Sequence, residues 1–272
     1  MSISNYVAKK ANKDPKEIHK IFKGVNSFEG LIEAMNETLN VPELKMNKDP
    51  GYEKSGIQEK ERLSYKVKFL KDLGIEIPKD GTYLDHGCGS GKITSEVNRE
   101  FGPYDRVIGV DIYEHDLLKG RGIDFVRPGD DGTLNIPSDS VSFITCFLSI
   151  HHVSLQKKTA QELMRILKPG GLLVILEHNF KKSMRLFLDA VHMTFSLYGT
   201  ENENERSDSD NDENQNPNMS KKIVPEDVQW IKDTKYLTLD QLRKLFSGLQ
   251  DCKYHNLRNS QEMYFIVFTK GA

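Results

Sequence analysis

Between residues 82 and 178 the sequence alternates short apolar runs with stretches of helical periodicity. The apolar runs have the length of strands and are, in chain order, "TYLDHG", "RVIGVDI", "SVSFITCFLSI" and "LLVILEH". Two stretches between them, "GKITSEVNREFG" and "QKKTAQELMRILKPGG", have the pattern of helices. Strands that alternate with helices build a parallel sheet covered on both faces. The sequence therefore predicts an α/β fold of the doubly wound, Rossmann-like kind with a mostly parallel sheet.

Helical patterns also flank this core. The first 75 residues contain "KDPKEIHKIFKG", in which Asp14 is placed as N-cap and Pro15 in the first turn. After residue 180 come an amphipathic helix that ends at Gly199 and a helix opened by a capping box of Thr238 and Gln241. The runs "CKYHNLRN" and "EMYFIVFTK" predict a C-terminal antiparallel hairpin. We expect residues 1–75 to form a helical extension or lid and residues 76–272 to form the α/β domain.

One segment of the chain is strongly acidic. Residues 201–220 carry seven acidic side chains against one arginine and include a single apolar residue, Met219. Such a segment does not bury enough apolar surface to offset its ordering entropy. We therefore expect a disordered insert at 200–222 within the domain. The formal net charge of the whole chain is −2, which argues against a strongly basic nucleic-acid binder.

Composition also bears on the compartment. The sequence contains no apolar run near the roughly 20 residues that span a bilayer, and its first residues lack the apolar core of a secretory signal. Three cysteines, at 88, 146 and 252, are sparse and have no metal-like spacing. These features favour a cytoplasmic, reducing compartment, no membrane association and no metal site. The oligomeric state stays open.

A glycine-rich turn follows the first strand. In "LDHGCGSGKIT" the glycines are Gly87, Gly89 and Gly91, a G-x-G-x-G spacing that departs from the dinucleotide pattern G-x-G-x-x-G. Asp111 ends the second strand about 20 residues later, where a carboxylate can accept both hydroxyls of a ribose. The pair predicts a nucleoside-containing ligand other than NAD. Taken alone, the glycine turn also fits a purely structural helix start, and Asp111 also fits a helix cap.

These motifs, in this order, resemble the class I S-adenosylmethionine-dependent methyltransferases. Within them the chain is most similar to the group of small-molecule, type 11-like enzymes. The resemblance covers roughly residues 80–180, and the order of the motifs is more specific than any one of them. It implies S-adenosyl-L-methionine as cofactor and transfer of its methyl group to an acceptor.

The resemblance also implies roles for individual residues. Those near the methionine part of the cofactor are Asp85, Gly87, Cys88, Gly89 and Gly91. Asp111 would hold the ribose and Ile112 the adenine face, while Asp130, with Asp131 as a neighbour, would accept from the adenine amino group. Phe147 stands at a cofactor-contacting position where the family more often has a small polar residue.

Three polar residues near strand ends are candidates for catalysis. His151 follows the third apolar run, and Glu177 and His178 end the fourth. Any of them could take a proton from an acceptor. Packing and a solvated strand end remain alternatives, and the adjacent histidines 151 and 152 lack the partners of a metal site.

The acceptor is not named by any motif. A small molecule is favoured, because the sequence lacks the N/D-P-P-Y/F/W tetrapeptide of amino-methylating DNA enzymes and a Pro-Cys pair. An RNA acceptor, in a cap or a tRNA, is the alternative. A binding module that keeps the fold without catalysis is a further one.

Overall fold

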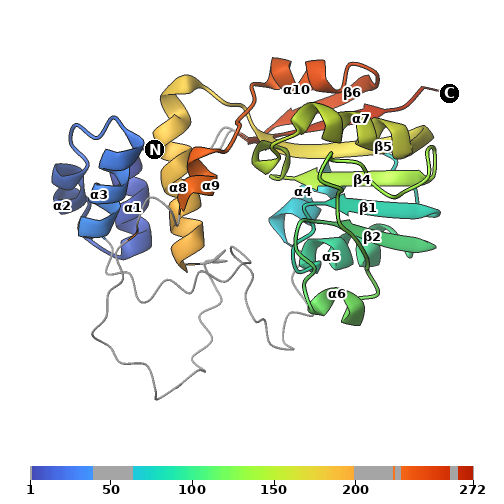
Figure 1. The fold of residues 1–272 in the computed structure, drawn as a ribbon, viewed down its shortest axis with the longest axis horizontal. Helices are drawn as coiled ribbons and strands as arrows, with labels where there is room; N and C mark the ends of the chain where they lie inside the picture. Colours follow the sequence, from blue (N-terminus) through green and yellow to red (C-terminus); the bar gives the residue numbers. More distant parts are fainter. Residues whose placement is uncertain (1, 39–63, 199–222, 224–227, 258–262, 272) are drawn as a thin grey trace. The chain divides into compact units, whose positions relative to one another are not determined.

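The computed structural model describes residues 2–38, 64–198, 223, 228–257 and 263–271 (Figure 1). The acidic tract lies outside the described residues. Contacts divide the chain into two compact units, one of residues 1–54 and 181–233, the other of residues 55–180 and 234–272. This division groups the helix at 65–72 with the sheet, whereas the sequence analysis grouped it with the N-terminal helices.

The larger unit contains a sheet of seven strands in the order β3-β2-β1-β4-β5-β7-β6. Neighbouring strands from β3 to β5 are parallel, and β7 is antiparallel to both β5 and β6. The predicted mostly parallel sheet with a C-terminal antiparallel hairpin is confirmed. The strands are β1 Thr82–His86, β2 Arg106–Val110, β3 Asp124–Val126, β4 Val141–Phe147, β5 Leu167–His178, β6 Gln250–Asn256 and β7 Met263–Thr269.

Helices cover both faces of this sheet (Figure 1). One face carries α4 Tyr65–Asp72, α5 Lys92–Phe101 and α6 Leu117–Gly120. The other face carries α7 Gln156–Ile166 and α10 Leu239–Leu245. Side chains that alternate along each strand fill the two cores, so Tyr83 packs on the first face and Leu84 on the second. The predicted capping box of Thr238 and Gln241 opens α10.

The strand order places a topological switch between β1 and β4. The chain leaves β1 toward α5 on one face, and leaves β4 through the 3-10 turn η1 Ile150–His152 toward α7 on the other. In open α/β sheets, ligands bind at the carboxyl ends of the strands beside such a switch. The sequence elements that carry the predicted site residues all end at this edge.

The second unit is helical in its described residues. Its helices are α1 Ile3–Ala11, α2 Pro15–Ile21, α3 Phe28–Thr38, the short η2 Lys182–Met184, α8 Arg185–Tyr198 and α9 Gln229–Lys232. Asp14 accepts from the backbone of Lys16 and so caps α2, as the sequence predicts. Segments from distant parts of the chain join within this unit, since the ring of Tyr6 lies edge-on to that of Phe187 at 5.6 Å. Among the described residues, no helix combines the length and hydrophobicity that crossing a membrane requires.

Candidate functional site

The glycine turn lies against the end of β2. The backbone N–H groups of Gly87 and Cys88 both donate to the carbonyl of Val110, at 2.7 and 3.2 Å. Gly87, Gly89 and Gly91 have φ angles of 77°, 50° and 76°, the left-handed region that glycine adopts without strain. The turn is therefore fixed beside the residue that follows Val110, which is Asp111.

Two of these glycines are also required by packing. A Cβ atom on Gly87 would lie 2.4 Å from the Cβ of Ser149, and one on Gly91 would lie 2.5 Å from the Cδ1 of Ile123. Ser149 follows β4, and its hydroxyl donates to the carbonyl of His86 at 2.9 Å. The turn thus joins the ends of β1 and β4 closely. Ser149 could not be found from a local pattern, because its contact with Gly87 spans 62 residues of chain.

We expect Gly87→Ala to lower the free energy of unfolding by about 3 kcal/mol or more, because strained φ and the clash add. Urea unfolding followed by circular dichroism measures this change. Ser149→Gly removes the side chain that the new methyl group would meet. Gly87→Ala should therefore cost less stability in the Ser149→Gly protein than in the wild type. No recovery in this double-mutant cycle would contradict the packing explanation.

Asp111 is held in place by two backbone donors. Its Oδ2 accepts from the N–H of Gly89 at 2.9 Å, and its Oδ1 accepts from the N–H of Ile112 at 2.7 Å. Each carboxylate oxygen keeps capacity for a further donor, which fits the two hydroxyls of a ribose. Ile112 is 62% exposed, so its apolar side chain is available to cover the face of a base. The donor and acceptor set therefore fits an adenosyl ligand.

The loop after β3 distinguishes the two aspartates predicted to meet adenine. Oδ1 of Asp131 accepts from the backbone N–H of Thr133 at 2.9 Å and from its hydroxyl at 2.6 Å, and these bonds lower the pKa of that carboxyl. Asp131 therefore closes its own turn. Asp130 is exposed and makes no hydrogen bond to other described residues. The geometry favours Asp130 over Asp131 as the group that meets a ligand.

Asp85 is buried beneath the turn rather than exposed to solvent. Its two oxygens accept from the hydroxyls of Thr94 and Thr145, at 2.6 and 2.7 Å. Burial raises the pKa of the Asp85 carboxyl to about 6, although both hydroxyls act against the shift. Sequence reasoning missed both threonines, which lie on α5 and β4. The carboxylate of Asp85 makes the electrostatic potential under the turn negative. The two threonine hydroxyls hold it in position.

We expect Asp85→Asn to change how the stability of the protein depends on pH. Because the folded-state pKa is raised from 3.8 to about 6, the folded protein holds this proton more tightly than the unfolded chain. The wild-type contribution is thus present at low pH and is lost as pH rises through about 4 to 6. Asparagine offers one acceptor where the carboxylate offers two, so the variant loses one hydroxyl contact at every pH. Its stability relative to wild type should nevertheless rise by about 1–3 kcal/mol across that window. Urea unfolding at several pH values measures this, and a pH-independent difference would contradict it.

Phe147 contributes its ring to the core. The ring is buried and lies edge-on to Phe265 at 5.8 Å, so only the backbone of this residue is available at the sheet edge. Leu148 follows with φ 58°, a left-handed conformation that bulky residues rarely adopt. Its N–H donates to the carbonyl of Leu176 at 2.8 Å, which holds this conformation. Strained backbone of this kind is typical of functional strand ends.

His151 and Glu177 form a buried pair at the ends of β4 and β5. The distance between Nδ1 of His151 and Oε2 of Glu177 is 2.7 Å. The other oxygen, Oε1, accepts from the backbone N–H groups of Ile150 and His151 at 3.0 and 3.4 Å. When Nδ1 of His151 carries the proton, it donates to Glu177 as the two backbone N–H groups do. Nε2 is then the basic nitrogen of the imidazole.

Burial sets the ionisation of this pair. It lowers the pKa of the His151 imidazole to about 3, which keeps the ring neutral at neutral pH. Burial raises the pKa of the Glu177 carboxyl, while the charge of His178 and backbone donors act against that shift. Of the three predicted catalytic candidates, His151 and Glu177 are thus in direct contact.

A ring cluster surrounds His151. The rings of His178 and Tyr236 both lie 5.4 Å from it, and the Tyr236 ring is roughly parallel to it. Phe180 stacks on the other side of Tyr236 at 5.3 Å. Tyr236 belongs to the segment 234–237, which the sequence did not connect with the strand ends. The cluster encloses His151 in an apolar, water-poor environment.

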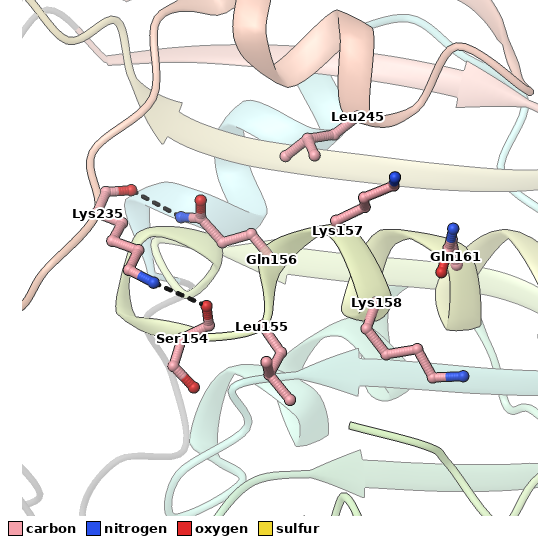
Figure 2. A pocket seen from close by; sticks show the side chains of 8 residues that line it. All are labelled: Ser154, Leu155, Gln156, Lys157, Lys158, Gln161, Lys235 and Leu245. Carbon is pink, nitrogen blue, oxygen red and sulfur yellow. Dashed lines mark hydrogen bonds between the residues drawn. The ribbon is translucent and has the colours of Figure 1, made fainter. Parts of the chain in front are cut away.

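The segment 234–237 is attached to η1 by hydrogen bonds. The N–H of Lys235 donates to the carbonyl of His151 at 2.8 Å. The side chain of Gln156 donates to the carbonyls of Ile150 and Lys235, at 3.0 and 2.7 Å, and Lys235 Nζ donates to the carbonyl of Ser154 (Figure 2). Gln156 thus fixes Tyr236 over His151.

An open pocket of about 550 Å³ lies on the outer side of these contacts (Figure 2). Its lining comes from the start of α7 and from neighbouring segments and includes three lysines: Ser154, Leu155, Gln156, Lys157, Lys158, Gln161, Lys235 and Leu245. None of the predicted cofactor or catalytic residues lines it. The chemistry of the strand ends, rather than this pocket, defines the candidate site.

Part of the chain resembles known methyltransferases. Residues 84–175 match a family model described as methyltransferase domain. A demethylmenaquinone methyltransferase of Staphylococcus aureus is 25% identical over 175 residues, which cover 62% of this chain and 62% of that protein. The chain therefore spans less than two thirds of the length of this relative.

Two solved structures resemble this chain at low identity. The 4+2 cyclase SpnF has a TM-score of 0.50 and 13% identity, with 82% of this chain and 86% of that chain covered. This likeness concerns the fold alone. A phosphoethanolamine N-methyltransferase of Haemonchus contortus, in complex with S-adenosyl-L-methionine, has a TM-score of 0.48 and 13% identity, with 76% of this chain and 52% of that chain covered.

Proposed function

We propose that this chain, whose residues 84–175 belong to the class I S-adenosylmethionine-dependent methyltransferases, methylates a small-molecule acceptor. The observation that carries the proposal is the joint position of the glycine turn and Asp111 at adjacent strand ends. The pair His151–Glu177, at the ends of β4 and β5, adds a group that can accept a proton.

Residues at the ends of β1, β2 and β3 would hold the cofactor. Asp111 would accept the ribose hydroxyls, Ile112 would cover one face of the adenine, and Asp130 would accept from its amino group. When bound, S-adenosylmethionine supplies a methyl group on a positively charged sulfur. The carboxylates at this edge would stabilise the positive charge of the sulfonium before the reaction. The enclosed environment would favour the transition state, in which that charge is dispersed.

His151 would remove a proton from the acceptor. Nε2 is its basic nitrogen, because Nδ1–H faces the carboxylate of Glu177. As the proton arrives, the imidazole becomes positive, and Glu177 stabilises it at 2.7 Å. Alignment of the acceptor beside the methyl group supplies most of the rate enhancement, a term worth roughly 7–11 kcal/mol in favourable cases. An acceptor that loses a proton on methylation, through oxygen or carbon, fits this arrangement.

The small-molecule class is supported by two observations. The chain has a net charge of −2, and a protein that binds nucleic acid phosphates is usually basic. The S. aureus relative is named for a small-molecule acceptor, demethylmenaquinone. An RNA acceptor is the second candidate. Residues 201–220 carry a net charge of −6 against −2 for the whole chain, so the rest of the chain has a net charge of +4, which is the argument for RNA.

Transfer of a labelled methyl group tests the proposal. The protein is incubated with methyl-labelled S-adenosylmethionine and cell extract, and the label is then measured in small-molecule, RNA and protein fractions. We expect label in the small-molecule fraction, with Asp111→Ala protein as the control that shows none. Label in RNA alone would show that the acceptor is RNA and not a small molecule. Binding of the cofactor without transfer of label to any fraction would contradict an enzymatic function.

A further inference from the structure

A chain of buried hydroxyl groups connects Asp85 with the core of the sheet. The hydroxyl of Thr145 donates to Oδ1 of Asp85 at 2.7 Å, and its oxygen lies 2.7 Å from the phenol oxygen of Tyr83. Tyr83 and Asp85 lie two residues apart on β1 and therefore on the same face, and Thr145 is the partner of Asp85 on β4. All three side chains are buried. The proposed function gives no role to Tyr83.

The direction of these hydrogen bonds follows from the number of protons. A hydroxyl has one proton to donate, and Thr145 gives its proton to Asp85, whose carboxylate can only accept. Tyr83 must therefore donate to Thr145. A donor that itself accepts a hydrogen bond is polarised and donates more strongly. Tyr83 thus strengthens the bond between Thr145 and the carboxylate, although its own hydroxyl is bonded to Thr145.

The phenol of Tyr83 is fixed as a donor. Its ring stacks on that of Phe143 at 5.3 Å and lies 5.3 Å from the ring of Tyr104. Burial, together with the negative charge of Asp85, raises the pKa of the Tyr83 hydroxyl well above its usual range, so the hydroxyl stays protonated. The hydroxyl of Tyr104 is also buried, but it makes no hydrogen bond within the described part of the chain. The same ring cluster therefore contains one tyrosine hydroxyl connected to Asp85 and one that is not.

Other groups around Asp85 do not depend on Tyr83. The ammonium of Lys66, on α4, lowers the pKa of the Asp85 carboxyl, and the carboxylate of Asp111, after β2, raises it. On α5, the hydroxyl of Thr94 donates to the second oxygen, Oδ2. The thiol of Cys146, on β4, stays protonated because burial raises its pKa well above the usual range. Replacement of Tyr83 therefore changes one donor and leaves these groups in place.

We propose that Tyr83 is a positioning residue for S-adenosylmethionine, which acts through the hydroxyl of Thr145 to keep the carboxylate of Asp85 charged and oriented beneath the glycine turn. The inference rests on the proposed function and adds to it a residue that does not contact the cofactor. A charged carboxylate at this position stabilises the positive groups of the cofactor, an ammonium and a sulfonium, whereas a protonated carboxyl group does not.

The proposal predicts how cofactor affinity depends on pH. Because the pKa of Asp85 is about 6, the affinity should fall as pH falls through this value. Loss of the Tyr83 hydroxyl weakens the donor to the carboxylate and raises this pKa, which moves the fall in affinity to higher pH. A merely structural role of Tyr83 would lower the affinity equally at every pH.

Isothermal titration with S-adenosylmethionine between pH 5 and 7.5 tests the proposal, since the ammonium of the ligand stays charged in this range. The proteins are wild type, Tyr83→Phe, Thr145→Val, Thr145→Ser and Tyr104→Phe. Thr145→Ser keeps the hydroxyl that links Tyr83 to Asp85, and Tyr104→Phe is the matched control, which removes the hydroxyl without a link. Urea unfolding shows that each variant is folded at each pH.

Tyr83→Phe should bind within about twofold of wild type at pH 7.5 and about threefold more weakly at pH 5, a shift of about half a pH unit. Thr145→Val loses the direct donor and should shift the fall in affinity by about one pH unit or more. Thr145→Ser and Tyr104→Phe should follow wild type.

Three results would overturn the role of Tyr83. They are a loss in Tyr83→Phe that is equal at both pH values, no loss at pH 5, and a wild-type affinity that does not change across this range. If the wild type does not bind S-adenosylmethionine at any pH, the proposed function fails instead.

Discussion

Replacement of Asp111 by alanine is expected to reduce the affinity for S-adenosylmethionine by two to four orders of magnitude. The carboxylate would accept two ribose hydroxyls, and hydrogen bonds to a charged acceptor contribute about 1.5–3 kcal/mol each. It also orients the glycine turn through the N–H of Gly89, at 2.9 Å. Isothermal titration with S-adenosylmethionine and S-adenosylhomocysteine measures the loss.

Two variants separate binding from folding. Asp116→Ala removes an exposed aspartate five residues further along that makes no capping hydrogen bond, and it should leave the affinity unchanged. Asp111→Asn keeps one carbonyl acceptor and should lose less than the alanine variant. If Asp111→Ala binds as well as wild type while it remains folded, the ribose role of this carboxylate is wrong.

Replacement of His151 by asparagine is expected to lower the rate of methyl transfer by about 100- to 10,000-fold, the usual contribution of a general base. The asparagine amide can occupy the position of Nδ1–H and keep the hydrogen bond to Glu177, so the fold should be retained. It has no basic nitrogen in the place of Nε2. Affinity for S-adenosylmethionine should stay within a few-fold of wild type.

The rate is measured with labelled cofactor and the fraction that accepts the methyl group. His255→Asn is the control, because His255 is an exposed histidine on β6, away from these strand ends. A full rate in His151→Asn would show that the acceptor needs no base, or that another group removes the proton. A parallel loss in His255→Asn would indicate a structural rather than a chemical effect.

Local patterns predicted much of the sheet. The strands β1, β2 and β4 and residues 172–178 of β5 follow apolar runs, as expected for strands buried on both faces. The sequence analysis assigned residues 167–171 to the end of the preceding helix, whereas that helix ends at Ile166 and these residues begin β5. The short β3 was not predicted, because its three residues, Asp124–Val126, are exposed or half-buried and show no strong pattern. The glycine turn and Asp111 were identified because each directly follows a strand and their spacing is characteristic.

The remaining parts of the site depend on contacts between distant residues. Glu177 lies 26 residues after His151, and only the pairing of β4 with β5 brings them to 2.7 Å. Thr94 and Thr145, which hold Asp85, come from a helix and a neighbouring strand. Tyr236 reaches His151 only through the fold of the segment 234–237. No periodicity or motif within one segment carries such information.

A crystal structure of the protein with S-adenosylhomocysteine tests the central claim most directly. The account predicts adenosyl density beside residues 87–91, with both ribose hydroxyls about 3 Å or less from the oxygens of Asp111. Density for the compound at another location, or a strand edge that stays closed to it at saturating concentration, would contradict the account.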